Sequence, residues 1–466
     1  MSFDSAVSGI RRFLLSRRFF MLLVIIGTAV FVAGSVSLGI PPPEGYGAPR
    51  VAPVQVAGVV LFVLLICFIL VVSDDITAVF CPFLILCVFA CDCYNSFDTF
   101  IRFWWLGIVA AAALIFHFVR YRMPLKIGKS FYGILAAGAS VLLGGIGFIT
   151  AKDYFAPISV FYTLALSVGM AVAYLLVRSQ LSRDVDYDRM DKYAEIMYVM
   201  GVFVCLESVW NILIRLEPII ATGCIPEIQQ HNNFATFMLF ALPFPFYFAR
   251  KNRAHLLTAL LMLLCLFTSG SRGATVSVIV LLPFLIAYFL ITSNDPARKK
   301  SNLIIGALIS VAGIVGVCAV FGAFSRIDGG FISNHESRYK LIKRAFRSFR
   351  RNPFFGAGLG YTGNIDIYLP KKGAFYWYHS MPLQIIGSLG IFGIVAYGYQ
   401  ALSRVAQVVR KLTPVTATLG LSYLGVLVMS CFNPGEFVPV PYELMTVVTF
   451  AMLEACAEST SALKNV

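Results

Sequence analysis

Charged side chains are scarce in this chain of 466 residues, where Asp, Glu, Lys and Arg together make up only 13%. A water-soluble domain carries roughly twice that fraction, so the composition excludes a soluble protein of this length. Mean hydropathy is +0.82, and apolar stretches of about 20 residues, long enough to cross a bilayer, fill most of the chain. The sequence therefore predicts an all-α polytopic membrane helix bundle, one integral membrane domain over residues 1–466 with about 12–14 transmembrane helices.

Acidic residues are scarcer than basic ones, 23 against 37, which leaves a net charge of +14. In a membrane protein such cations set topology and contact anionic lipid, so we expect membrane lipid as a partner and no nucleic acid. Zinc-type spacings are absent too, because the closest cysteine pair, Cys91 and Cys93, is a poor chelate. We expect no metal and no cofactor. The first apolar run, residues 19–40, is long enough to stay in the membrane rather than act as a cleaved signal.

The short loops orient the helices, because Lys and Arg accumulate on the cytoplasmic side. Basic clusters occupy the N-terminus and alternate connections, whereas the connections between them hold one basic residue or none. One inner loop, Ser73 to Asp75, lacks positive charges. The alternation predicts that both termini are cytoplasmic and that residues 325–380 form a long extracytoplasmic loop. About fourteen candidate spans underlie this count: residues 20–40, 54–73, 76–91, 100–118, 130–150, 156–177, 193–214, 232–249, 254–270, 273–292, 302–322, 381–403, 414–431 and 441–458.

The loop from Ser325 to Ser380 holds ten Lys and Arg against three Asp and Glu. That excess runs against the positive-inside trend, from which long translocated loops are partly exempt, and indicates that something outside the membrane uses the charge. The spacing over residues 336–351 predicts an amphipathic helix in the membrane interface. The alternative is a helix that only anchors the loop to anionic headgroups. Its apolar stripe is Leu341, Ile342, Ala345, Phe346 and Phe349, and its basic stripe is Lys340, Lys343, Arg344, Arg347 and Arg351.

A glycine-rich turn and a histidine follow this helix. Gly356, Gly358 and Gly360 allow positive φ and close backbone approach, so their amides are candidates to converge on an anionic oxygen. The strand and helix of a nucleotide-binding GxGxxG motif are absent. Aromatic residues before a span are typical of the interface, but His379, at the mouth of the span that opens with Met381, can take a proton from a hydroxyl near neutral pH.

Two further outer sites complete the candidate set. Arg272 lies between two closely spaced spans, where a buried arginine indicates a functional site and snorkelling to the headgroups is the alternative. His231 and Asn232 begin another span from outside. Arg215 and Glu217 flank the loop before it and have mutual pairing as their alternative.

Together, in this order and topology, the motifs over roughly residues 200–455 resemble the O-antigen ligase/polymerase family of bacterial envelope glycosyltransferases. They are the His231-Asn-Asn-Phe entry, Ser271-Arg272-Gly273, Arg338 with the amphipathic helix, Asn352-Pro353 to Gly360, and His379 with Gly387 and Gly390 after it. Such proteins often have Asn after the loop histidine, where this chain has Ser380.

The resemblance implies the fold of lipid-carrier-dependent (GT-C-type) glycosyltransferases. It also implies transfer of a glycan from undecaprenyl diphosphate to an acceptor, a glycan or lipid A-core, on the outer face of the bacterial cytoplasmic membrane, without a metal. His379 would be the base, and Arg272 and Arg338 would neutralise the diphosphate, since guanidinium pairs bidentately with phosphate. The expected substrate-binding residues are Arg215, His231, Asn232, Lys340, Arg344, Arg347, Gly356, Gly358 and Gly360.

Other functions remain open at this point. A peptidoglycan polymerase would share the lipid-linked chemistry, but its outer-loop carboxylate is not evident. A secondary transporter would show internal repeats and charges near span centres. A flippase for lipid-linked glycan would use the same arginines without needing His379. The sequence does not separate ligase from polymerase, because those differ only in the acceptor.

Overall fold

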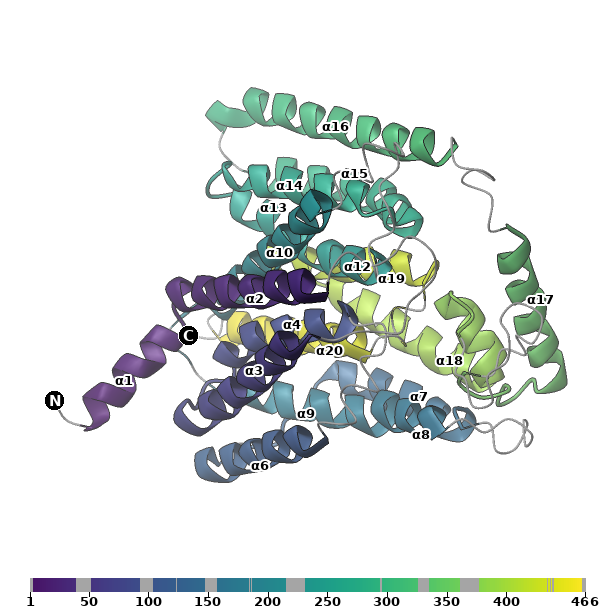
Figure 1. Ribbon diagram of the computed structural model, residues 1–466, viewed down its shortest axis with the longest axis horizontal. Coiled ribbons are helices and arrows are strands. Elements are labelled where there is room, and N and C mark those ends of the chain that lie inside the picture. Colours follow the sequence, from purple (N-terminus) through teal and green to yellow (C-terminus); the bar gives the residue numbers. More distant parts are fainter. Residues whose placement is uncertain are drawn as a thin grey trace. The chain divides into compact units, whose positions relative to one another are not determined.

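All regular secondary structure in the described residues of the computed structural model is helical (Figure 1). Helices satisfy their backbone hydrogen bonds internally, which suits a chain this apolar. The all-α prediction is confirmed for this part of the chain. The structure describes residues 3–38, 52–92, 104–122, 124–146, 157–183, 185, 187–214, 231–293, 296–325, 335–360, 377–433, 435, 437 and 440–462.

The helices in chain order are α1 (Phe3–Leu14), α2 (Arg17–Leu38), α3 (Pro53–Val72), α4 (Thr77–Asp92), α6 (Trp104–Tyr121), α7 (Lys129–Gly144), α8 (Pro157–Leu164), a π-helical turn (Ala165–Gly169), α9 (Met170–Gln180), α10 (Arg189–Ile214), α12 (His231–Ala241), α13 (Pro243–Ala249), α14 (His255–Thr268), α15 (Arg272–Thr292), a 3₁₀ turn (Pro296–Arg298), α16 (Lys299–Ser325), α17 (His335–Arg351), α18 (Met381–Val409), α19 (Pro414–Ser430) and α20 (Val440–Ala462).

Eight helical stretches in the described residues are long and apolar enough to cross a membrane, and five shorter apolar helices accompany them. Each of the predicted spans coincides with helical chain, although residues 232–249 form two helices, α12 and α13. Leu242 separates this pair, and Pro243 begins the second helix. The chain is therefore a multi-pass membrane protein.

The chain divides into two compact units built from interleaved segments. The first unit comprises Met1–Pro124, Arg183–Thr275 and Leu282–Val317, and the second comprises Leu125–Ser182, Val276–Leu281 and Cys318–Val466. The expectation of one integral membrane domain over residues 1–466 stays a prediction.

In the first unit, α10 packs against α2, α4 and α12–α14, and α3 packs against α2, α4 and α6. Phe203 of α10 is fully buried and meets the ring of Phe89 edge to face, with centroids 6.1 Å apart. Asp74, in the loop that lacks positive charges, pairs with Arg11 at 3.2 Å and with Arg183 at 3.0 Å. Helix α1 and the loop after α9 thus supply the cations that this loop lacks.

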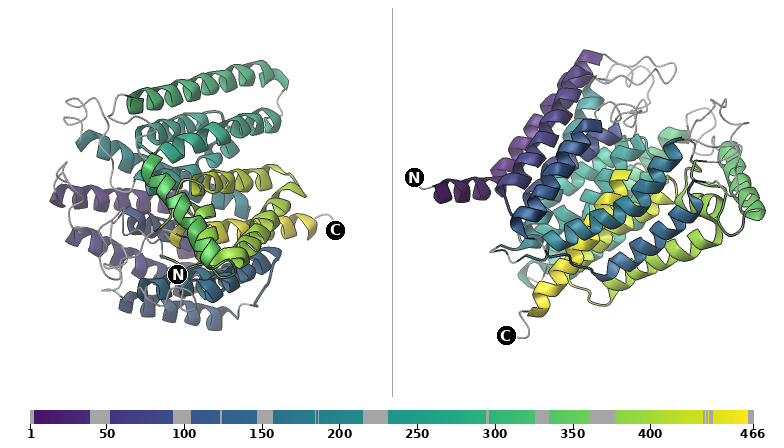
Figure 2. Two further views of the ribbon diagram at one scale, coloured as in Figure 1. Left: turned by 90° about the vertical axis from the view of Figure 1, so that its right-hand side faces the viewer. Right: turned by 90° about the horizontal axis from the view of Figure 1, so that it is seen from below.

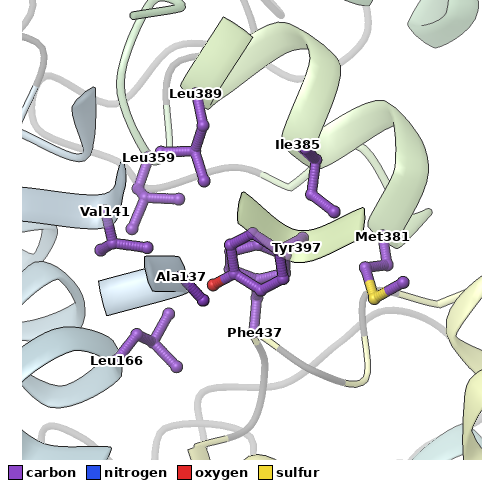
Figure 3. Close-up of a cluster of buried hydrophobic side chains, with 9 residues drawn as sticks. All are labelled: Ala137, Val141, Leu166, Leu359, Met381, Ile385, Leu389, Tyr397 and Phe437. Carbon is purple, nitrogen blue, oxygen red and sulfur yellow. The ribbon is translucent and has the colours of Figure 1, made fainter. Parts of the chain in front are cut away.

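In the second unit, α18 packs on α7, α17 and α19, and α20 packs on α9 and α19. Figure 2 shows α17 crossing the beginning of α18. At the centre of the apolar core, the rings of Tyr397 and Phe437 lie 5.1 Å apart (Figure 3). Leu359, from the turn after α17, enters the same core and fixes that turn to the bundle. The other members of the core cluster are Ala137, Val141, Leu166, Met381, Ile385 and Leu389.

Candidate active site

Helix α18 is broken near its start, and the glycine-rich turn docks into the break. Gly390 adopts φ 64° and ψ −151°, which frees backbone groups that a regular helix would pair. The amides of Ile391 and Phe392 instead donate to the carbonyls of Pro353 and Phe354, at 2.8 and 3.2 Å. A Cβ on Gly390 would lie 2.5 Å from the Pro353 carbonyl oxygen, so the docking requires glycine at this position.

The three glycines of the turn have left-handed backbone conformations, with φ 69° at Gly356, 96° at Gly358 and 80° at Gly360. A Cβ on Gly356 would clash with the Ser388 backbone. The Gly356 amide donates to the Asn352 carbonyl at 2.9 Å, and the Gly358 amide donates to the Ser388 carbonyl at 3.0 Å. Because protein carbonyls occupy the amides of Gly356 and Gly358, the expectation that these two amides converge on an anionic oxygen does not fit the structure. The Gly358 amide instead joins the turn to α18. For Gly360 the expectation stays a prediction.

His379 lies immediately before α18 in a strained backbone conformation. Its φ is 52°, in the left-handed region that non-glycine residues rarely adopt. Strain of about 1–3 kcal/mol persists only where the surroundings enforce it, and it clusters at functional sites. The side chain keeps an exposed surface, so a substrate can reach the imidazole.

A hydrogen-bonded support on either side of His379 enforces this conformation. The amide of Tyr378 donates to Gln384 Oε1 at 3.0 Å, and Gln384 Nε2 donates to Ser388 Oγ at 2.7 Å. The Tyr378 hydroxyl lies 3.2 Å from Ser348 Oγ of α17, and its buried ring packs against Leu341 and Ala345 of that helix. His379 is therefore held between α17 and the first turns of α18.

The pKa of His379 is lowered from its ordinary value. The main cause is desolvation by the protein packed around part of the ring, and the second is the positive charge of Arg338. Both causes disfavour the imidazolium, so His379 is neutral at neutral pH and can accept a proton. Arg338 is exposed near the start of α17, and its Nη1 donates to the Phe432 carbonyl at 3.3 Å. The second unit thus joins a neutral base to a guanidinium.

Helix α17 presents three faces rather than the predicted two. The buried face contains Leu341 and Ala345 as expected, but also Arg344 and Ser348, each 8% exposed. Arg344 was predicted on the basic stripe, and that placement is wrong because its position lies one turn from the buried Leu341 and Ser348. Ile342 and Phe346 of the predicted apolar stripe are exposed instead. The exposed substrate-binding candidates on this helix are Lys340 and Arg347.

In the first unit, the motifs around residues 232 and 271 meet. Ser271 is the N-cap of α15, where its hydroxyl accepts from the Ala274 amide at 3.2 Å and donates to Asn232 Oδ1 at 2.7 Å. Arg272, half-buried, is the first residue of α15. A helix N-terminus favours anions, and the guanidinium adds charge to it. His231 begins α12, but its side chain and all of Arg215 lie outside the described residues.

Sequence reasoning missed the support residues Gln384, Tyr378 and Ser348. The signal for Gln384 was available, because a glutamine inside an apolar span is costly to bury unless its amide has partners. Tyr378 follows aromatic residues that are typical of the interface, yet it is 1% exposed. Among the described residues, no group of three or more His, Cys, Asp or Glu side chains is placed to hold a metal ion.

Comparison with known proteins shows that part of the chain is similar to a known family. No curated protein and no solved structure matches the chain. Residues 257–398 match the family model described as O-antigen ligase, and this region contains Arg272, α17, the glycine-rich turn and His379. It is shorter than the 200–455 region that the motifs suggested and leaves out His231 and Asn232. This match over residues 257–398 supports the resemblance of the chain to the O-antigen ligase/polymerase family.

Proposed function

We propose that this protein transfers a glycan from undecaprenyl diphosphate to a hydroxyl group of an acceptor sugar, on the outer face of the bacterial cytoplasmic membrane. The observation that carries the proposal is the placement of His379. This residue lies within the family-matched region, in a strained backbone conformation beside Arg338, with an exposed imidazole. An accessible neutral imidazole suits the deprotonation of a hydroxyl.

The reaction forms one bond and breaks one. His379 takes the proton of the acceptor hydroxyl as the oxygen attacks the anomeric carbon of the donor glycan. The bond between that carbon and the diphosphate oxygen breaks, and undecaprenyl diphosphate leaves with the bonding electrons. Attack opposite the leaving group inverts the anomeric configuration. The base removes the proton that would otherwise build up positive charge on the attacking oxygen.

Neutralising the departing diphosphate is assigned to Arg338 of the second unit and not to a metal, and the same role for Arg272 of the first unit stays a prediction from the sequence. Guanidinium groups bind phosphate oxygens bidentately and stabilise charge that develops on the leaving group. Lys340 and Arg347, exposed on α17, would attract the anionic donor. The Asn232 side chain accepts a hydrogen bond from the Ser271 hydroxyl at 2.7 Å. Asn232 would therefore hold the start of α15, and with it Arg272, in place. Arg215 and His231 stay predictions.

The orientation of the chain is part of the same proposal. Alternating loop charges support cytoplasmic termini and an outer loop at residues 325–380. The pairing of Asp74 with both Arg11 and Arg183 supports it too, because it joins three segments that are assigned to the cytoplasmic side, the N-terminal helix α1 and two loops. Lipid diphosphate donors are presented on the outer face, where His379 would then lie.

Purified protein in nanodiscs, supplied with an undecaprenyl-diphosphate oligosaccharide, tests the proposal. Wild type should produce glycan transfer that His379→Ala and Arg272→Ala abolish. Full transfer by both variants would contradict the assigned roles. No transfer by wild type, whether lipid A-core is present or absent, would favour a flippase or transporter. Running the assay with and without lipid A-core separates the two activities: chain growth without the core indicates a polymerase, and product only with the core indicates a ligase.

A further inference from the structure

The exposed surface of α17 divides into two stripes of different chemistry. Tyr339, Ile342 and Phe346 recur at spacings of three and four residues and are 56%, 40% and 46% exposed. Large apolar side chains this exposed, on one line of a helix outside the candidate spans, indicate contact with something apolar. The described part of the chain does not cover this stripe.

A basic stripe runs beside the apolar one. Lys343, Arg347, Arg350 and Arg351 are all exposed, and Lys343 Nζ lies 4.2 Å from the centre of the Tyr339 ring, at the boundary between the stripes. The third face of the helix is committed to the protein, because Leu341 and Ala345 pack on Tyr378. The helix therefore cannot rotate to bury its apolar stripe without losing its own core contacts.

The surface next to α17 continues onto a spanning helix. Phe354, three residues after α17, is 59% exposed, and its carbonyl accepts the amide of Phe392 at 3.2 Å. The neighbouring Phe355 ring stacks on the ring of Phe392, with centroids 5.1 Å apart and planes 12° apart. Phe392 is itself exposed on α18, which is long and apolar enough to cross the membrane. The end of α17 thus leads directly onto the exposed surface of a helix that is able to cross the membrane.

We propose that α17 lies on the bilayer surface, with its apolar stripe in the headgroup boundary and its basic stripe on the phosphates of anionic phospholipids. The two stripes match the two layers of such a surface, acyl chains below and phosphates above. The inference goes beyond the glycan-transfer reaction, since it concerns bulk lipid rather than substrate. It places the loop that bears Arg338 and His379 at the level where a lipid diphosphate emerges from the membrane.

Photocrosslinking to lipid tests the proposal in the full chain. p-Benzoylphenylalanine replaces Phe346 in one variant and Arg347 in a matched control, and both proteins are reconstituted in nanodiscs without any glycan. Mass spectrometry then maps the adducts. We expect acyl-chain adducts at position 346 at a yield roughly fivefold above position 347, because the next residue is turned about 100° around the helix. Equal yields, or adducts to protein alone at position 346, would overturn the proposal.

The charge component has its own arm. Discs of phosphatidylcholine are compared with discs in which about a third of the lipid is phosphatidylglycerol. The anionic lipid should raise the yield at position 346, and neutralising Lys343, Arg347, Arg350 and Arg351 to Gln should remove the difference. A yield indifferent to lipid charge contradicts the assignment of the basic stripe. Adducts that form only when undecaprenyl-diphosphate glycan is added would assign the face to substrate and also overturn the proposal. Because neither arm needs transfer, a failed reaction proposal would leave its outcome unchanged.

Discussion

Helix α18 carries an ionisable group at each end, and the two ends are built in opposite ways. Near its C-terminus, the buried Arg404 donates to Glu443 at 2.7 Å and lies over the rings of Tyr423 and Phe450. Just before its N-terminus, the accessible His379 has a strained backbone, and the positive charge of Arg338 helps to lower its pKa. The first arrangement supplies opposite charge and aromatic faces to a buried cation. The second lowers the basicity of a group open to substrate. The comparison teaches that one end of the helix is built to stabilise the fold, whereas the other is built like the site proposed for the chemistry.

The largest expected effect separates activity from stability at His379. His379→Ala should lower the transfer rate by roughly 10²–10⁴-fold, the usual contribution of a general base, with little change in the midpoint of thermal unfolding. His379→Gly is the matched variant, because it relieves the left-handed strain of about 1–2 kcal/mol and should raise the midpoint while staying inactive. Glycan transfer and thermal unfolding in detergent measure both quantities. An active His379→Ala protein would remove the base from the mechanism.

The reverse pattern is expected at the other end of the helix. Glu443→Gln leaves Arg404 buried without its carboxylate, which should lower the free energy of unfolding by about 3–5 kcal/mol. The transfer rate per folded molecule should hold. The control is a double change of Arg404 and Glu443 to Met, which removes both charges and should recover most of the loss. If Glu443→Gln abolished transfer in protein that unfolds at the normal midpoint, this pair would belong to the chemistry and the contrast would fail.

The sequence predicted the helical architecture well because long apolar runs have only one way to satisfy their backbone in lipid. It also brought His379 and the glycine-rich turn to attention through residue type and position, and Arg338 through the resemblance to the family. It misassigned the turn, since sequence shows that Gly356 and Gly358 permit close approach but not which groups approach. The structure shows that the Gly358 amide meets the Ser388 carbonyl of α18, whereas the Gly356 amide meets the Asn352 carbonyl.

The same limit explains the misplaced residues of α17. The helical stripes drawn from hydrophobicity grouped Leu341 and Ala345 with Ile342 and Phe346 and put Arg344 on the basic stripe. The buried face is set by the tertiary contact with Tyr378, which periodicity alone does not contain. Similarly, the sequence did not show that Tyr378 is buried, because its partner Ser348 lies thirty positions earlier in the chain.

A smaller effect is expected from the support of His379. Gln384→Leu removes the acceptor of the Tyr378 amide, and an orphaned buried donor costs about 1–3 kcal/mol. The loosened imidazole should lower kcat by roughly tenfold while KM changes little, because misplacement of a catalytic group affects the transition state more than binding. Gln384→Glu keeps an acceptor oxygen and should restore part of kcat. A purely structural role would instead lower the yield of folded protein and leave kcat per folded molecule intact.

The smallest effect concerns the pH dependence that Arg338 sets. Transfer requires neutral His379, so the rate is full above the pKa of this group and is lost as pH falls through it. Arg338 lowers that pKa, so Arg338→Gln should raise it and move the acid limb of kcat/KM to higher pH, by less than about one pH unit because desolvation is the larger cause. The measurement is the midpoint of the limb, which a general loss of rate does not move. Arg350→Gln, on the same helix, removes an equal charge and should leave the limb in place. If Arg338→Gln shifts the limb no more than Arg350→Gln does, the titrating base is not beside Arg338, and the assignment of His379 loses its electrostatic support.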